Sequence, residues 1–255
     1  MTSIFKHLLA DLLKNRIIIG SFLLFALTGW GLFFIESQPQ KALLVLMQVT
    51  LLAIPLITLV FSSIYYYNSG EFIELLLSHP VKRGEVIQSF HMALSTAFSI
   101  AYLLGIGLPI LVFSASVHGA TLLLVGLLLI WIFIGISLFI STLIHDRVRG
   151  MGLTLITWAF FAFLFDGLLI YLMYTFADYP IEKWILFLTF LNPVDIGRIA
   201  VIMQTEAAAM MGLSGAIFRD FFGSAKGVIV SFGVLMLWVV SMYLLAVRNF
   251  RRRDL

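Results

Sequence analysis

The few residues of this chain that could do chemistry do not form the patterns that catalysis needs. The 255 residues include no cysteine, which excludes disulfides, thiol catalysis and Cys-ligated metal sites. The spacing of His79, His91 and His118 gives no i, i+4 pair of the kind that holds a metal on a helix. The segment 223–227 (GSAKG) comes nearest to a phosphate-binding loop, but it lacks the first glycine and the Ser or Thr after the lysine. We therefore predict a non-catalytic chain that binds no metal and no cofactor of its own.

Three of the ten methionines, Met203, Met210 and Met211, gather in one segment. Thioether sulfur is a suitable ligand for cuprous ion. No histidine accompanies these methionines, however, and methionine commonly fills apolar gaps. We interpret them as packing or docking residues rather than as metal ligands.

The composition indicates a membrane protein. Hydrophobic residues make up 62% of the chain and charged residues 11%, with a mean hydropathy of +1.08, whereas a soluble domain is about half apolar and a quarter charged. Stretches of about 20 apolar residues can cross a bilayer. We predict an all-α polytopic protein, a single domain 1–255 in which an amphipathic interfacial helix precedes six spans. These lie at 3–16 (interfacial helix) and at about 17–35, 42–67 (kinked at Pro55), 88–114, 120–144, 151–177 and 227–247.

The positions of Lys and Arg predict how the spans are oriented. With the N-terminus inside, eleven of the sixteen Lys and Arg fall in cytoplasmic segments, as the positive-inside rule favours. Both termini are then cytoplasmic. The basic tail RNFRRR (248–253) is interpreted as an anchor to lipid headgroups rather than as a nucleic-acid-binding patch.

An outer segment, 178–226, is too apolar to be a simple tether between spans. WILFLTFL (184–191) is too short to cross the bilayer, and Asn192-Pro193 interrupts the apolar run. We predict a re-entrant or interfacial hairpin capped at Asn192 or Asp195, with Pro193 in a first helical turn, followed by a short helix and a glycine-rich return. The residues predicted to contact a periplasmic partner are Asn192, Pro193, Asp195, Arg198, Met210 and Met211.

Asp166 is the one carboxylate within the predicted spans. An ionisable group at that depth costs several kcal/mol unless it is paired, protonated or hydrated, so it is a functional candidate. The structural alternative is an inward-facing carboxyl, protonated or hydrogen-bonded to a hydroxyl on a neighbouring helix, with Thr154 and Thr157 as further donors. We favour the structural alternative, because a transported metal cation would need several such ligands.

The polar segment between the second and third spans, EFIELLLSHPVKRGE (71–85), holds good helix formers that end at Pro80. Its charges place it on the cytoplasmic face. It is either a solvated turn that obeys the positive-inside rule or a docking helix for a cytoplasmic partner, and the residues alone leave both open. Under the second interpretation the contact residues are Glu71, Glu74, Leu75, Leu76, Leu77, Pro80, Lys82, Arg83 and, in the loop 145–149, Arg147.

This segment resembles the one between spans two and three of type-2 ABC-transporter permeases, whose Leu-Leu-x-x-Pro-x-x-Arg core matches Leu76, Leu77, Pro80 and Arg83. Six spans, an amphipathic N-terminal helix and an outer hairpin agree with that family over the full length. The chain departs from it at Phe72-Ile73, where Gly-Thr is frequent, and at Gln88-Ser89, where many members carry a Lys. The resemblance implies a bacterial inner-membrane permease, with ATP and Mg bound by a separate ABC ATPase subunit.

A narrower resemblance rests on LNPVDIGR (191–198), LFDGLL (164–169) and FRRR (250–253). These stretches are similar to the permeases of systems that mature the copper centre of nitrous oxide reductase. The resemblance implies a homodimer in the lipid bilayer, a dimer of the ATPase at segment 71–85 (below, the elbow) and a periplasmic copper-handling protein at the outer hairpin.

Other functions stay open. The chain could be an ABC-type exporter permease for another small molecule or a lipid-like cargo. A secondary transporter driven by an ion gradient would need several intramembrane ionisable residues, and Asp166 is alone in the predicted spans. An intramembrane enzyme would need catalytic groups facing each other within the spans, whereas Glu71 and Glu74 lie outside the hydrocarbon.

Overall fold

The computed structural model describes residues 2–176, 179, 182–202 and 225–252, and these residues form helices joined by short loops, without a strand among them. Six helical stretches in this part of the chain are long and apolar enough to cross a membrane. Their bounds are Arg16–Ile35, Pro39–Asn68, Arg83–Phe113, Val117–Leu143, Arg147–Thr175 and Gly227–Arg252. The prediction of an all-α polytopic membrane protein is confirmed.

Four of the spans are formed by α2 (Arg16–Ile35), α3 (Pro39–Asn68), α7 (Val117–Leu143) and α13 (Ala225–Arg252). The third is built from α5 (Arg83–Tyr102), the π-helical η1 (Leu103–Gly107) and α6 (Leu108–Phe113), and the fifth from α8 (Arg147–Ala159), η2 (Phe160–Leu164) and α9 (Phe165–Thr175). The shorter helices are α1 (Thr2–Lys14), α4 (Gly70–Leu77), α10 (Glu182–Thr189) and α11 (Pro193–Ile202). Helix α3 continues through Pro55, where a kink was predicted.

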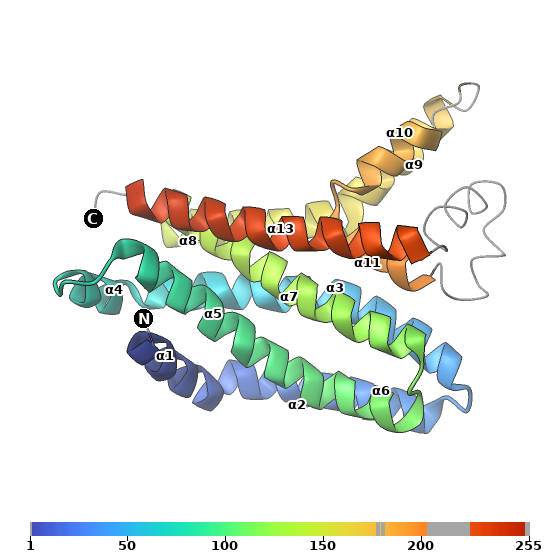
Figure 1. Cartoon of the computed structure of the whole chain (residues 1–255), viewed down its shortest axis with the longest axis horizontal. Coiled ribbons are helices and arrows are strands. Elements are labelled where there is room, and N and C mark those ends of the chain that lie inside the picture. The colour runs from blue at the N-terminus through green and yellow to red at the C-terminus, as the bar shows by residue number, and fades with distance from the viewer. Residues whose placement is uncertain (1, 177–178, 180–181, 203–224, 253–255) are drawn as a thin grey trace.

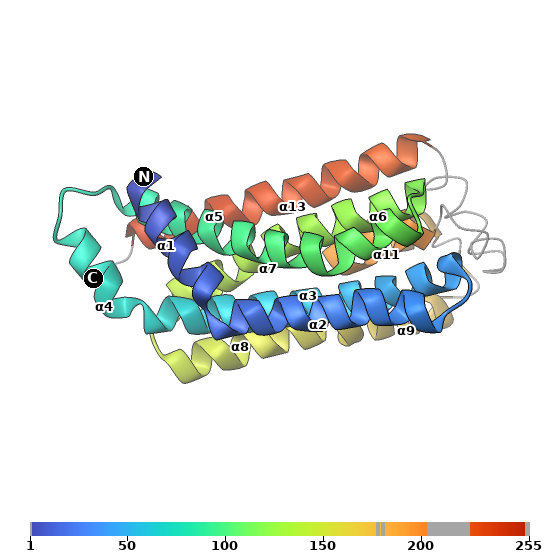
Figure 2. The same ribbon diagram turned by 90° about the horizontal axis from the view of Figure 1, so that it is seen from below.

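Helix α7 lies at the centre of the bundle. It packs against α3 and α13 along most of its length and against α5, α8 and α11 over shorter stretches. Its apolar side chains point inward on several faces, and Leu129, Ile130, Ile132 and Phe133 are completely buried. Because α7 is hydrophobic all round, the other helices can surround it, as the central position requires. Figure 2 shows α1 crossing one end of the bundle and α8 lying along α3.

Helix α1 packs on protein more than a purely interfacial helix would. Leu8 and Leu12 on its apolar face are buried, and the helix lies against α5. The Tyr65 hydroxyl of α3 donates a hydrogen bond to the Asp11 carboxylate over 2.9 Å. The amphipathic pattern predicted the helix, but part of its apolar face is covered by α5.

The third and fifth spans contain π-helical turns that the apolar pattern does not predict. In η1 the Leu108 N–H donates to the Leu103 carbonyl, and in η2 the Phe165 N–H donates to the Phe160 carbonyl, five residues back in each case. The η1 turn lies against α2, where a Cβ on Gly105 would be 2.5 Å from Cβ of Phe25. Such turns are frequent at functional positions, and η2 ends two residues before Asp166.

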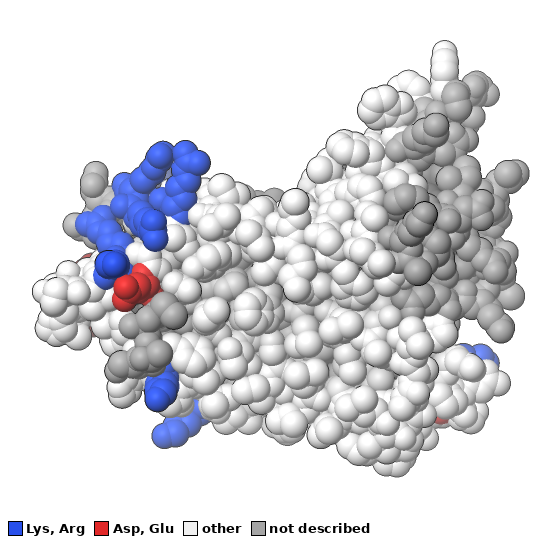
Figure 3. All heavy atoms as spheres, viewed as in Figure 1, with Lys and Arg blue, Asp and Glu red and all other residues white. Residues whose placement is uncertain are grey.

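The two termini and α4 lie at the same end of the bundle (Figures 1 and 2). Lys and Arg side chains gather at this end, whereas the middle of the visible face carries none (Figure 3). At the opposite end, α9 and α10 lean away from the other helices (Figure 1). The bundle therefore has a basic end that carries α4 and an opposite end that carries α10 and α11.

Candidate functional site

Helix α4 presents an apolar and acidic surface at the basic end. It follows α3 directly after Ser69, and Ile73 faces inward, 4% exposed. Leu76 and Leu77 are half-buried against the core. The outward side carries the two carboxylates and two apolar side chains, with Leu75 60% and Phe72 38% exposed. The side chains that face the bundle thus hold the helix in place, while its outer side is exposed.

The turn after α4 fixes the direction of the chain into α5. The Ser78 hydroxyl donates to the Leu75 carbonyl over 2.7 Å, and the Val81 N–H donates to the His79 carbonyl over 2.7 Å, which closes the turn around Pro80. Pro80 and Lys82 are exposed, and Arg83 is half-buried at the start of α5.

Two contacts tie this elbow to other spans. The Tyr67 hydroxyl near the end of α3 donates to the Ile144 carbonyl over 2.9 Å, beside the loop that leads into α8. Gly84 at the start of α5 lies against the Arg251 guanidinium of α13, where a Cβ would be 2.7 Å from Nη2. These contacts join α3 to the end of α7 and α5 to α13, on either side of α4.

The α7–α8 loop lies at this end as well. Asp146 caps α8 by accepting a hydrogen bond from the Arg149 N–H over 2.7 Å. Arg147 is exposed, as a contact residue must be, and Val148 beside it is 78% exposed. Val148 and Phe72 were not among the predicted contacts, although each is an exposed apolar side chain close in sequence to charged residues.

At the opposite end, an ion pair joins the fifth span to the hairpin. Arg198 of α11 forms a charged hydrogen bond with Asp166 in the first turn of α9, Nη1 to Oδ2 at 2.6 Å. The same Nη1 lies 3.2 Å from Oδ1 of Asp195, one turn earlier on α11. Asp195 is 4% exposed, so two carboxylates and one guanidinium meet in a largely buried cluster. Below, the Asp166–Asp195–Arg198 cluster means these three side chains.

The predicted hydroxyl partners of Asp166 are wrong. Thr154 donates to the Met151 carbonyl and Thr157 to the Leu153 carbonyl, so both hydroxyls are bound to their own helix. A carboxylate within a span requires a partner, and the sequence offered Arg198 in the adjacent hairpin. Arg198, predicted to contact an outer partner, pairs with Asp166 within the chain.

Asn192 organises the start of α11. Its Oδ1 accepts a hydrogen bond from the Val194 N–H over 3.0 Å, as predicted for a capping residue, and its Nδ2 donates to Asp195 over 2.8 Å and to the Phe161 carbonyl of η2 over 2.9 Å. Pro193 is the first residue of the helix. One turn on, Gly197 lies against α7, where a Cβ would be 2.7 Å from Val125. The LNPVDIGR segment therefore holds α11 against both η2 and α7.

The residues predicted to contact an outer partner differ in position. Asn192, Pro193 and Asp195 are buried within the chain, and Arg198 is partly exposed. Met203, Met210 and Met211 lie outside the described residues, as does most of the segment after α11. Contact of any of these side chains with a partner stays a prediction.

The buried position of Asp195 makes the cluster sensitive to pH. Burial and the neighbouring Asp166 carboxyl raise the pKa of Asp195 from 3.8 to about 7, against the opposing effects of Arg198 and Asn192. Because the pKa is higher in the folded chain, protonation favours the folded state. That stability is fully present below the ordinary carboxyl pKa and is lost as the pH rises through about 7.

We therefore expect the free energy of unfolding of the purified chain to fall by about 1 kcal/mol between about pH 6 and pH 8, which lowers the midpoint of thermal unfolding. The Asp195→Asn variant has no proton to lose at this position and should show a smaller fall over the same range. The measurement is the midpoint of thermal unfolding in detergent at each pH. Parallel pH dependence in wild type and variant would contradict a titrating Asp195.

Among the described residues, no group of three or more His, Asp or Glu comes together in a way that could hold a metal ion. Two other features stand out: the exposed apolar and acidic surface of α4 at one end, and the Asp166–Asp195–Arg198 cluster between the fifth span and α11 at the other.

The fold and these features define a polytopic α-helical membrane protein with a helical elbow after its second span. The family described as ABC-2 family transporter protein matches residues 2–255. The chain is also similar to the probable ABC transporter permease protein NosY of Stutzerimonas stutzeri, 25% identical over 277 residues that cover 96% of this chain and 95% of that protein. A second relative, the probable ABC transporter permease protein NosY of Pseudomonas aeruginosa, is 27% identical over 268 residues that cover 97% of this chain and 96% of that protein. This chain belongs to the ABC-2 family of transporter permeases.

Proposed function

We propose that this chain is the membrane subunit that receives movement from a separate ABC ATPase through α4. The observation that carries the proposal is the outer side of α4, where Leu75 and Phe72 are exposed beside two carboxylates while Ile73 packs against the bundle. Apolar side chains uncovered among charges at the end of a bundle are suited to a protein partner. ATP and Mg belong to that partner.

The basic end is the cytoplasmic end under this proposal, so both termini are inside and the α10–α11 end is periplasmic. The gathering of Lys and Arg at the α4 end supports that orientation. A bacterial inner membrane is the location in which an ATPase on one side and a periplasmic partner on the other are both available.

Movement of α4 has a physical route to the other end. Helix α3 is continuous with the elbow and packs along α7, and α7 contacts α11. The core around α7 is densely apolar, which supports rigid-body movement of spans rather than a polar conducting path. Two copies of the chain, one for each ATPase of a dimer, would rock against each other and move the outer hairpins.

We further propose that the outer event is maturation of the copper centre of nitrous oxide reductase. The two curated relatives that carry the name NosY, each matched over nearly its whole length, support this assignment. The partners are then a NosF-like ATPase at α4 and a periplasmic NosD-like protein at the hairpin. In this proposal the chain transmits movement to the copper-handling partner and does not itself carry the metal.

The test of the α4 surface is co-purification in mild detergent. Leu75→Asp puts a third carboxylate at the centre of the exposed face and should lower recovery of the ATPase at least tenfold. Val117→Asp, at a 73% exposed position at the other end of the bundle, is the matched control and should leave recovery unchanged. Equal recovery with both variants would contradict docking at α4.

The same strains test the assignment to copper. Nitrous oxide reductase isolated from cells that express Leu75→Asp should lack its copper centre, whereas the Val117→Asp strain should yield a normal enzyme. If Leu75→Asp loses the ATPase and the reductase still carries its centre, the copper assignment fails while the role of α4 stands.

A further inference from the structure

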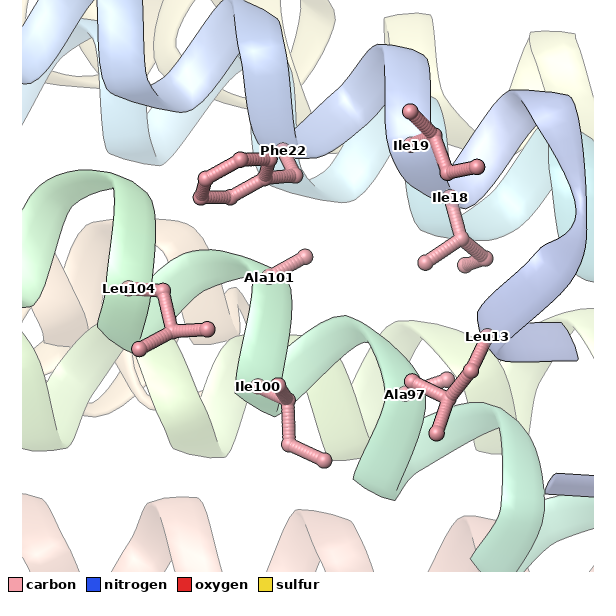
Figure 4. Close-up of a pocket in the computed structure, with 8 residues that line it drawn as sticks. All are labelled: Leu13, Ile18, Ile19, Phe22, Ala97, Ile100, Ala101 and Leu104. Atoms are coloured by element: carbon pink, nitrogen blue, oxygen red, sulfur yellow. The ribbon is translucent and has the colours of Figure 1, made fainter. Parts of the chain in front are cut away.

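An apolar cavity of about 150 Å³ lies on the side of the bundle between the α1–α2 junction and the third span (Figure 4). Its inner wall is formed on α5 by Ala97 and Ala101, which are 0% and 3% exposed. These two alanines lie one turn apart, and their short side chains leave the hollow that Phe22 of α2 and Leu104 of η1 border. This cavity, called the groove below, forms because small residues on α5 face larger ones on α2.

The position and lining of the groove select a hydrocarbon occupant. All eight lining residues are apolar. Four of them, Leu13, Ile19, Ile100 and Leu104, are 37–45% exposed, so the groove opens to the surroundings of the bundle, which along a span are lipid. An apolar cavity of this size does not hold water stably. A segment of an acyl chain matches this apolar lining.

Two cations lie at the α1–α2 junction, which borders the groove. Lys14 ends α1 and Arg16 begins α2, and both are exposed. Between them, Asn15 caps α2 by accepting a hydrogen bond from the Ile17 N–H over 2.9 Å, which fixes the bend. Leu13 and Ile18, which line the groove, are their neighbours in the sequence. The nearest carboxylate in the sequence, Asp11, accepts a hydrogen bond from Tyr65 of α3.

We propose that this groove binds an anionic phospholipid, with its phosphate against Lys14 and Arg16 and one acyl chain along Ala97 and Ala101. The bend between α1 and α2 lies at the basic end, where headgroups are expected, and the groove runs from there along α2 and α5 into the span (Figure 4). A zwitterionic lipid of the same chain length would fill the groove equally well but would carry no net charge for the two cations. A bound lipid would lie between α2 and α5 and contact both helices.

The test compares lipid binding to the purified chain by native mass spectrometry. Phosphatidylglycerol and phosphatidylcholine with identical acyl chains are the probes, and the wild type should retain phosphatidylglycerol with roughly tenfold preference. Lys14→Gln with Arg16→Gln should abolish that preference. The control is Arg248→Gln with Arg252→Gln, which removes two exposed cations from α13 at the same end and should keep it.

A substitution that fills the groove distinguishes binding at this site from general attraction of lipids to the protein. Ala101→Leu should lower retention of both lipids, whereas Leu23→Trp, at a 58% exposed position of α2 outside the groove, should change neither. The proposal is overturned if the two pairs of Gln substitutions reduce the preference equally, because any cation would then suffice. Unchanged retention in a folded Ala101→Leu variant would overturn the groove as the site.

Discussion

Replacing Arg198 with methionine is expected to lower the free energy of unfolding by about 3 kcal/mol, because it leaves the Asp166 and Asp195 carboxylates facing each other without a cation. Removal of one partner from a buried pair costs about 3–5 kcal/mol. We expect the lower end of this range, since the side chains of Arg198 and Asp166 keep 28% and 30% of their exposure and water screens part of the charge. Resistance of the purified chain to chemical unfolding is the measurement.

Two controls distinguish a lost ion pair from a lost cation. Arg248→Met removes an exposed Arg from α13 and should change stability by less than about 0.5 kcal/mol. The triple variant Asp166→Asn, Asp195→Asn, Arg198→Met removes all three charges and should recover most of the loss, because uncharged replacement of a complete buried pair is often neutral. If Arg198→Met is no less stable than Arg248→Met, the cluster does not hold the hairpin on the fifth span.

Gly105→Ala is expected to destabilise the protein by about 1–3 kcal/mol, the usual cost of overpacking. The added Cβ would be 2.5 Å from Cβ of Phe25 and 2.9 Å from the Ala26 nitrogen of α2. Neither atom can rotate away, so α2 must move from the η1 turn. Close approach of helices at small residues contributes strongly to packing within membranes, where lipid competes equally for apolar contact.

Gly31→Ala is the matched control, because Gly31 lies on α2 with nothing within 4 Å of its added Cβ. There alanine should be neutral or stabilising by up to about 1 kcal/mol, as its higher helix propensity predicts. The midpoints of thermal unfolding of the two variants should therefore move in opposite directions. Equal midpoints would show that η1 and α2 separate at little cost.

Both predictions concern contacts on the route by which we propose that movement passes from α4 to the opposite end of the bundle. Gly105 lets η1 lie directly on α2, and Arg198 joins α11 to α9. The pH dependence expected of Asp195 belongs to the same connection, since deprotonation adds a second negative charge beside Arg198.

The sequence was sufficient for the elements that depend on local composition. Six spans could be predicted because crossing a bilayer takes about 20 apolar residues, whichever helices lie beside the span. The amphipathic α1, the elbow helix that ends before Pro80 and the Asn192 cap follow from spacing over one or two turns, and all three occur. The pattern also predicted exposed apolar side chains on the elbow helix, and Leu75 is exposed there together with Phe72, which the prediction omitted.

Tertiary structure alone decided which residues meet. The π-helical turns leave no mark in an apolar pattern, because they depend on how η1 and η2 meet α2 and α11. The groove arises where two alanines on α5 face a bend that lies more than 80 residues earlier in the chain. The pattern of residues within one helix cannot predict which other segment will lie beside it. Asp166 and Arg198 are 32 residues apart, and only the return of the hairpin brings them to 2.6 Å. Sequence determines what a side chain needs, such as a partner for a carboxylate in lipid, but the packing of the chain determines which residue supplies it.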